Sequence, residues 1–68
     1  MNNPTLAAIW RKVAQTWQLY AERMQELADE AGRSSHAELV GQFDADAQRF
    51  RDNAKTAWAK VAELEGVS

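Results

Sequence analysis

Apolar side chains recur along this chain in alternating steps of three and four residues, with one interruption near residues 32–35. This spacing collects apolar groups on one stripe of an α-helix, because a helix completes a turn in about 3.6 residues. The first stripe is Leu6, Trp10, Val13, Trp17, Tyr20, Met24, Leu27 and Ala31. The second stripe is Val40, Phe43, Ala47, Phe50, Ala54, Ala57, Val61 and Leu64. The pattern predicts two amphipathic helices whose stripes form the core.

Residues that start and end helices divide the chain where the stripes break. Pro4 suits the first turn of a helix, and Asn3 can cap the helix in front of it. Gly32 can adopt the left-handed conformation that ends helices, and Ser35 and Glu38 have the spacing of a capping box. We expect one domain over residues 1–68, with a helix from about 4 to 31, a turn over 32–35 and a second helix from about 36 to 65.

A turn this short makes the two helices antiparallel neighbours, so the predicted fold is an all-α helical hairpin, a two-helix coiled coil. A register in which facing residue numbers add up to 67 places seven residues of each stripe opposite a residue of the other stripe. Trp17 then faces Phe50, and Trp10 faces Ala57. Large residues opposite small ones favour this register, since a dense core needs complementary shapes.

Alanine recurs every seven residues beside the first stripe, at Ala7, Ala14, Ala21 and Ala28. Alanine is the best helix former, which is one explanation of this column. The other explanation, which we favour, is a second contact face where a further helix approaches closely. Docking of a second copy there predicts a four-helix bundle. The candidate interface is Ala7, Ala14, Ala21, Ala28, Ala37, Asp44, Arg51 and Trp58.

A chain of 68 residues needs support beyond its own core. Disulfides, a metal or association usually provide that support. The chain has no cysteine and one histidine, which excludes disulfides and argues against a histidine-rich metal site. Association with another chain is the support that remains.

Charge suggests how two copies would be oriented. Residues 20–46 carry seven acidic and two basic side chains, whereas the rest of the chain carries three acidic and six basic ones. An antiparallel pair of hairpins would place each acidic turn end beside a basic terminal end. We therefore expect a C2 homodimer in which Arg51 of one copy approaches Asp44 of the other.

A different docking partner is also open. Ile9, Leu19 and Leu39 are apolar residues away from the expected core, and they form a secondary candidate interface. Single exposed apolar residues are common on protein surfaces, so each is weak by itself. Together with Trp58 they allow an alternative, in which the chain is an accessory or structural subunit of a larger protein complex, including a virion assembly.

Catalytic and cofactor motifs are not found in the sequence. There is no glycine-rich phosphate loop, no G-x-S-x-G and no calcium-binding loop. Two straight helices also offer little concavity for a reaction. We therefore expect no enzymatic activity, no catalytic or metal-binding residues and no cofactor.

Nucleic acid and membrane partners are disfavoured on charge. The net charge is −2, whereas phosphate contacts dominate nucleic-acid affinity. A hairpin dimer nevertheless resembles, in architecture alone, the Rop-like helical-hairpin dimers that bind RNA, and a nucleic-acid-binding regulator stays a second alternative. The polar faces are mixed or acidic, unlike those of membrane-surface helices, and no stretch has a spanning length of apolar residues. A cytoplasmic protein is expected.

The function that these features favour is a small protein–protein interaction module. It would act as a homodimeric four-helix-bundle regulator or adaptor.

Overall fold

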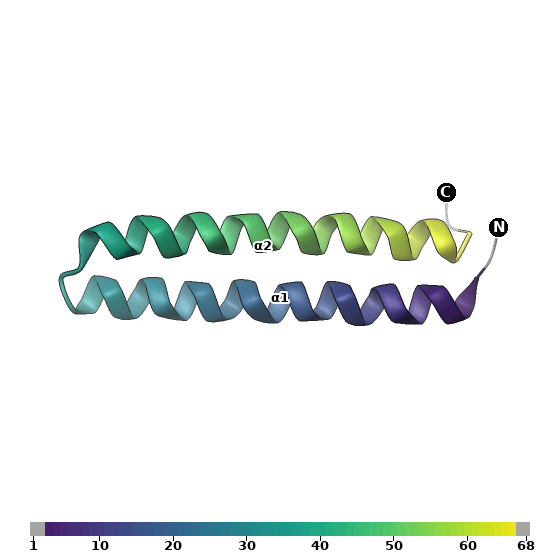
Figure 1. Cartoon of the computed structure of the whole chain (residues 1–68), viewed down its shortest axis with the longest axis horizontal. Helices are drawn as coiled ribbons and strands as arrows, with labels where there is room; N and C mark the ends of the chain where they lie inside the picture. The colour runs from purple at the N-terminus through teal and green to yellow at the C-terminus, as the bar shows by residue number, and fades with distance from the viewer. Residues whose placement is uncertain (1–2, 67–68) are drawn as a thin grey trace.

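The computed structural model describes residues 3–66, and it consists of two antiparallel helices joined by a short turn (Figure 1). Helix α1 comprises Pro4–Arg33 and helix α2 comprises Ala37–Leu64. Residues 1, 2, 67 and 68 of the expected domain lie outside the described residues. The backbone extends 50 Å in its longest direction and 16 and 11 Å in the others, so the molecule is a rod. These features confirm the all-α helical hairpin.

The two ends of the rod are fixed by backbone and capping hydrogen bonds. At the terminal end, the Asn3 side chain accepts a hydrogen bond from the Leu6 backbone N–H at 3.1 Å, which confirms the predicted cap before Pro4. The Asn3 N–H also donates to the Leu64 carbonyl at 2.7 Å. This second bond joins the start of α1 to the end of α2.

The turn differs in detail from the prediction. Helix α1 continues through Gly32 to Arg33, and the left-handed residue is Ser35, with φ of 61°. The predicted capping box of Ser35 and Glu38 is wrong. The N-cap of α2 is His36, because the left-handed Ser35 moves the start of α2 one position further along the chain. The His36 side chain makes no cap hydrogen bond.

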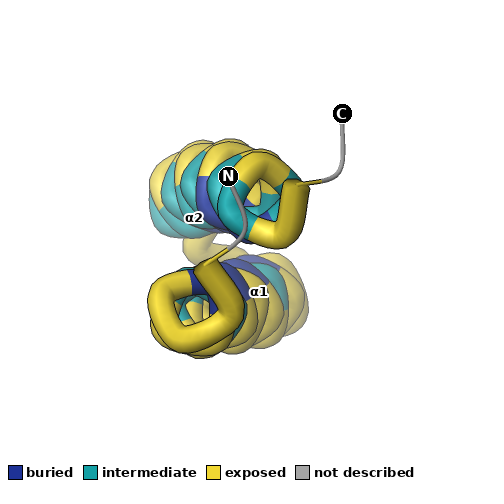
Figure 2. The backbone as a smooth tube through the Cα atoms, turned by 90° about the vertical axis from the view of Figure 1, so that its right-hand side faces the viewer, coloured by how far each residue is buried: buried dark blue, intermediate teal, exposed yellow. Residues whose placement is uncertain are grey.

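The core lies in the seam between the two helices, and it consists almost entirely of methyl groups (Figure 2). Eight of its nine buried residues are alanines, and no large side chain in the described chain is fully buried. Small side chains let two helix backbones approach closely, since side-chain size sets the distance between helix axes. The buried residues are Ala7, Ala14, Ala21, Ala28, Ala31, Ala47, Ala54, Ala57 and Val61.

Helix α1 presents a different stripe to the seam than the one predicted. The alanine column fills the positions expected for Leu6, Val13, Tyr20 and Leu27. Val13 is half-buried, while Leu6, Tyr20 and Leu27 are 36%, 47% and 43% exposed. The core prediction is therefore wrong for Leu6, Tyr20 and Leu27, whereas Val13 lies at the edge of the seam. Rotating α1 by one residue puts the smallest side chains at the closest approach and moves the bulky ones to the side.

The rest of the predicted core holds. Trp10, Trp17 and Met24 of α1 are half-buried at the edge of the seam, and Ala31 is buried. All eight predicted core residues of α2, from Val40 to Leu64, are buried or half-buried. The rings of Trp17 and Phe50 stack with centroids 5.4 Å apart, which confirms that pair of the predicted register.

Ser35→Gly should stabilise the hairpin by up to about 1 kcal/mol. A left-handed conformation costs a non-glycine residue about 1–2 kcal/mol, and the extra freedom of glycine in the unfolded chain offsets part of that gain. Urea unfolding followed by circular dichroism, at one fixed protein concentration, measures the change. Ser34→Gly is the control, because Ser34 has φ of −95° and should only lose stability. Equal losses in both variants would contradict the assignment of strain to Ser35.

Ala14→Leu should destabilise the hairpin by about 1–3 kcal/mol, because Ala14 is 0% exposed and the seam has no room for three more carbon atoms. Ala8→Leu is the matched control, since Ala8 is on the same helix and exposed. The same unfolding experiment compares the two variants. Similar stability for both would show that the methyl seam is not tightly packed.

Candidate protein-interaction site

The seam divides the surface of the hairpin into two unlike flanks. One flank, called here the polar flank, follows the side of the seam occupied by Arg11, Gln18, Gln25, Asp44, Arg51, Trp58 and Glu65. The opposite side, called here the apolar flank, is formed mainly by α1. Its residues are Leu6, Ile9, Val13, Trp17, Tyr20 and Leu27.

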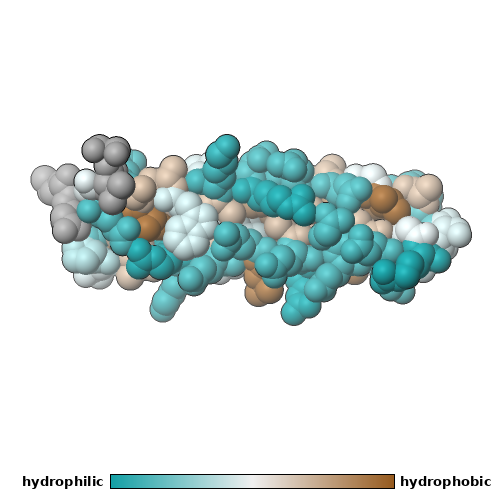
Figure 3. Space-filling view, turned by 180° about the vertical axis from the view of Figure 1, so that it is seen from behind, coloured by the Kyte–Doolittle hydropathy of each residue, from teal (hydrophilic) through white to brown (hydrophobic). Residues whose placement is uncertain are grey.

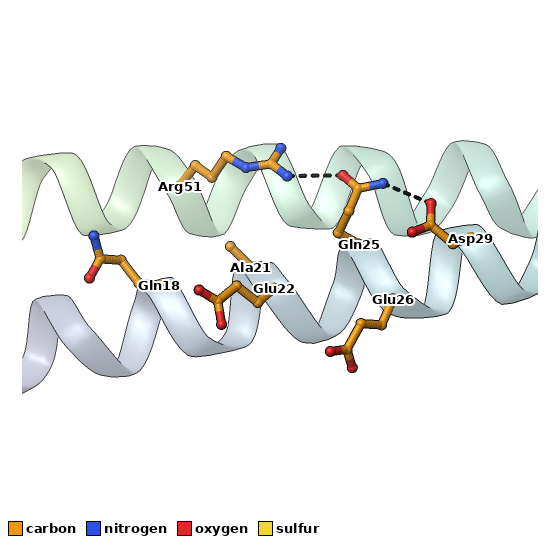
Figure 4. Close-up of a pocket in the computed structure, with 7 residues that line it drawn as sticks. All are labelled: Gln18, Ala21, Glu22, Gln25, Glu26, Asp29 and Arg51. Atoms are coloured by element: carbon orange, nitrogen blue, oxygen red, sulfur yellow. Dashed lines mark hydrogen bonds between the residues drawn. The ribbon is translucent and has the colours of Figure 1, made fainter.

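Gln25 is the centre of the polar flank, where it links the two helices (Figure 4). Its carbonyl oxygen accepts a hydrogen bond from the Arg51 guanidinium at 2.9 Å. Its amide nitrogen donates to carboxylate oxygens of Asp44 and Asp29, both at 3.4 Å. Nearer the chain ends, Arg11 of α1 forms an ion pair with Glu65. These polar contacts connect the helices at two places on the flank, around Gln25 and near the chain ends.

The hollows on the polar flank are open and lined by polar groups. One, of about 560 Å³, lies beside Gln25 and Arg51, with the Ala21 methyl group among its lining. Glu22 and Glu26 border it, and in Figure 4 the Glu26 carboxylate extends away from α2. The view from behind the hairpin shows hydrophilic side chains along most of its length (Figure 3). This side of the molecule therefore has the composition of a hydrated surface.

The alanine column is not a separate contact face. Ala7, Ala14, Ala21 and Ala28 are at most 3% exposed, because α2 of the same chain covers them. The prediction that a second copy docks on these four residues is therefore corrected: their contact face is used within the hairpin.

The other predicted interface residues are dispersed on the polar side. Ala37 is exposed at the start of α2, and Trp58 is half-buried beside Gln18, Lys55 and Arg51. Trp58 lies at a smaller hollow of about 350 Å³. The structure thus does not gather these residues into one apolar surface.

Arg51 and Asp44, which were predicted to pair between two copies, both contact Gln25 within this chain. Within this chain, Gln25 contacts both side chains, accepting from Arg51 and donating to Asp44. Their charges are thus engaged in linking α1 to α2. Any contact with a second copy at these residues would compete with the bonds of the hairpin itself.

The apolar flank has a groove without such polar links. The groove has a volume of about 370 Å³ and is open along α1. Ile9, Val13, Trp17 and Tyr20 supply its apolar lining, and Lys12 and Thr16 border it. The Thr16 hydroxyl donates to the Lys12 carbonyl at 2.8 Å, so this hydroxyl is satisfied within the helix. What the groove offers to a partner is mainly apolar surface.

An aromatic cluster forms the middle of the apolar flank. Trp17 stacks on Phe50 of α2, and the Tyr20 ring meets both rings edge-on, with centroids 6.0 Å from Trp17 and 6.1 Å from Phe50. The Arg49 guanidinium lies 5.8 Å from the Phe50 ring centroid. These contacts hold the rings in place, and Tyr20 still leaves about half of its surface exposed.

The secondary candidate interface is divided between two surfaces. Ile9 is 54% exposed and lines the apolar groove. Leu39 is half-buried near the turn. Leu19 is 47% exposed but does not line the groove.

Sequence reasoning missed that Leu6, Val13, Tyr20 and Leu27 belong to the surface. These residues recur every seven positions, parallel to the alanines, and this spacing was the signal that could have revealed them.

Charged side chains on the outer faces pair locally. Arg23 pairs with Glu26 at 3.1 Å, and Arg33 pairs with Glu30 at 2.8 Å, each three residues apart on α1. The hydrogen bond from Arg33 to Glu30 raises the pKa of Arg33 above its ordinary value. These pairs are exposed, and such pairs contribute little to stability.

Residues 3–66 contain neither a cluster of metal-binding side chains nor a helix that could span a membrane. No three histidine, aspartate or glutamate side chains in this range are grouped closely enough to hold a metal ion. Neither α1 nor α2 combines the length and apolar character that crossing a membrane requires.

Comparison of the chain with protein-family models, curated proteins and solved structures finds no match. Among the surfaces of the described chain, the apolar flank is the candidate interaction site.

Proposed function

We propose that this protein is a non-enzymatic protein–protein interaction module and that the apolar flank is its binding surface. The observation that carries this proposal is the location of the large apolar residues. The seam accommodates alanine and one valine, so the bulky side chains of α1 remain partly in contact with water. Burial of apolar surface is the main driving force of most protein association.

The geometry of the flank suits a helical partner. Leu6, Val13, Tyr20 and Leu27 recur every seven residues, so they form a straight row beside the seam. A row with this spacing is what a second helix meets when it packs along a coiled coil. Ile9 and Trp17 widen the row into the groove described above. The flank thus presents the apolar stripe that a helix-in-groove contact uses.

Both polar hollows favour a role without chemistry. Their linings are carboxylates, amides and cationic groups on open helix sides, and His36 is in the turn, where its ring nitrogen lies 2.9 Å from the Ser34 carbonyl. Arg11, at the basic terminal end, is engaged by Glu65. We therefore favour a protein partner over a nucleic acid. Docking onto a larger protein complex would use the same apolar flank.

A site-specific photo-crosslinking experiment tests the binding surface. Ile9 is replaced by p-benzoylphenylalanine in the full chain, expressed in the cells that make this protein naturally. We expect a covalent protein adduct after irradiation, because Ile9 is exposed in the middle of the apolar groove. The control is the same replacement at Gln15, an exposed residue of α1 outside that groove. Absence of an adduct at position 9, or equal adducts at both positions, would contradict the proposal.

A further inference from the structure

We propose that the occupant of the apolar flank is a second copy of this chain, docked antiparallel about a two-fold axis that passes beside Thr16 and Trp17. This inference rests on the proposed function and names its partner. It also moves the dimer interface to the flank opposite the one expected from sequence. Helix α1 then packs on α1 of the second copy, and α2 packs on α2.

The spacing of the apolar row is self-complementary about that axis. When two α1 helices run antiparallel with facing residue numbers adding up to 33, Leu6 meets Leu27 and Val13 meets Tyr20. Ile9 then meets Met24 in the same register. An isologous two-fold contact requires this property, because one patch must fit itself. The pairs also match large residues with smaller ones at Val13 and Tyr20.

Charge fixes the antiparallel orientation. The turn half of the hairpin, residues 20–46, has seven acidic and two basic side chains, and the terminal half has three acidic and six basic ones. Rotation about the proposed axis lays the turn half of one copy over the terminal half of the other. The alternative two-fold axis, along the rod, would stack both acidic ends together. Complementary charge of this kind favours one orientation and disfavours the other.

The broad face of the hairpin is large enough for a stable dimer. The backbone extends 50 Å by 16 Å in its two longest directions, so this face, with both helices, has an outline of roughly 800 Å². A standard protein interface buries about 800 Å² on each partner. A small chain whose own core is limited to methyl groups gains the support that short domains require when this flank is covered.

Sedimentation equilibrium of the purified chain tests the partner. At about 50 µM we expect twice the chain mass of 7.6 kDa. Ile9→Asp should raise the dissociation constant at least about tenfold, since burying a carboxylate against Met24 of the other copy costs more than about 1.4 kcal/mol. Leu19→Asp is the matched control: Leu19 is similarly exposed but lies outside the groove, so the dimer should persist. A monomer, a larger oligomer, or equal effects of both variants would overturn the proposal.

Single cysteines test the axis and the orientation, because the chain has no cysteine of its own. Thr16→Cys should form a disulfide with its own copy, whereas Gln15→Cys, on the polar side of α1, should not. A mixture of Leu6→Cys and Leu27→Cys should give the mixed disulfide, and Leu6→Cys alone should give none. Circular dichroism confirms that each variant is helical. Self-crosslinking of Leu6→Cys without the mixed product would overturn the proposal.

The crosslinking at Ile9 in cells separates this inference from the proposed function. An adduct with a second copy of the chain agrees with both. An adduct with a different protein leaves the interaction surface standing and overturns self-association. No adduct contradicts the function and the inference together.

Discussion

The close approach of two helix backbones across a seam of methyl groups is the constraint on which the rest of the structure depends. Alanine at Ala7, Ala14, Ala21 and Ala28, opposite the small residues of α2, leaves no space for larger groups between the helices. The bulky side chains therefore lie beside the seam, on one flank or the other. The methyl seam thus determines the composition of both flanks, and through them what the molecule can bind.

The two flanks differ in which side chains they carry and in what those side chains contact. On the polar flank, Gln25 and the Arg11–Glu65 pair join α1 to α2 through exposed contacts. On the apolar flank, Trp17, Tyr20 and Phe50 make contacts with one another but leave apolar surface exposed. Because polar groups on the first flank have partners inside the hairpin, the second flank has the larger capacity for a new partner.

The sequence determined the fold well, since the periodicity of three and four residues and the single break near Gly32 admit few other arrangements. Pro4 and Asn3 located the start of α1, and the stack of Trp17 on Phe50 was found from the register alone. The α2 stripe was also correct, because its small residues are part of the stripe itself. These features depend on local spacing, which a sequence displays directly.

The choice between two adjacent stripes on α1 could not be made from periodicity. Leu6, Val13, Tyr20 and Leu27 have the same spacing as the alanine column and are more hydrophobic, so a hydrophobicity argument selects them for the core. The distance between the helices decides which stripe enters the core. This distance is a tertiary property, because the side chains of α1 and α2 set it together. For the same reason the predicted interface included four alanines that are buried in the seam. The left-handed residue at Ser35 instead of Gly32 is a second case, since the backbone path of the whole turn selects it.

The hydrogen bond from the Asn3 N–H to the Leu64 carbonyl places both chain ends at the same end of the rod (Figure 1). A mechanical load applied between those ends would separate the helices one layer at a time, like a zipper, and would not shear the whole seam at once. Resistance to such a load is limited by the few contacts nearest the ends, however long the rod is. A load applied to opposite ends of the two helices, along the rod, would instead have to break the contacts of many layers at the same time.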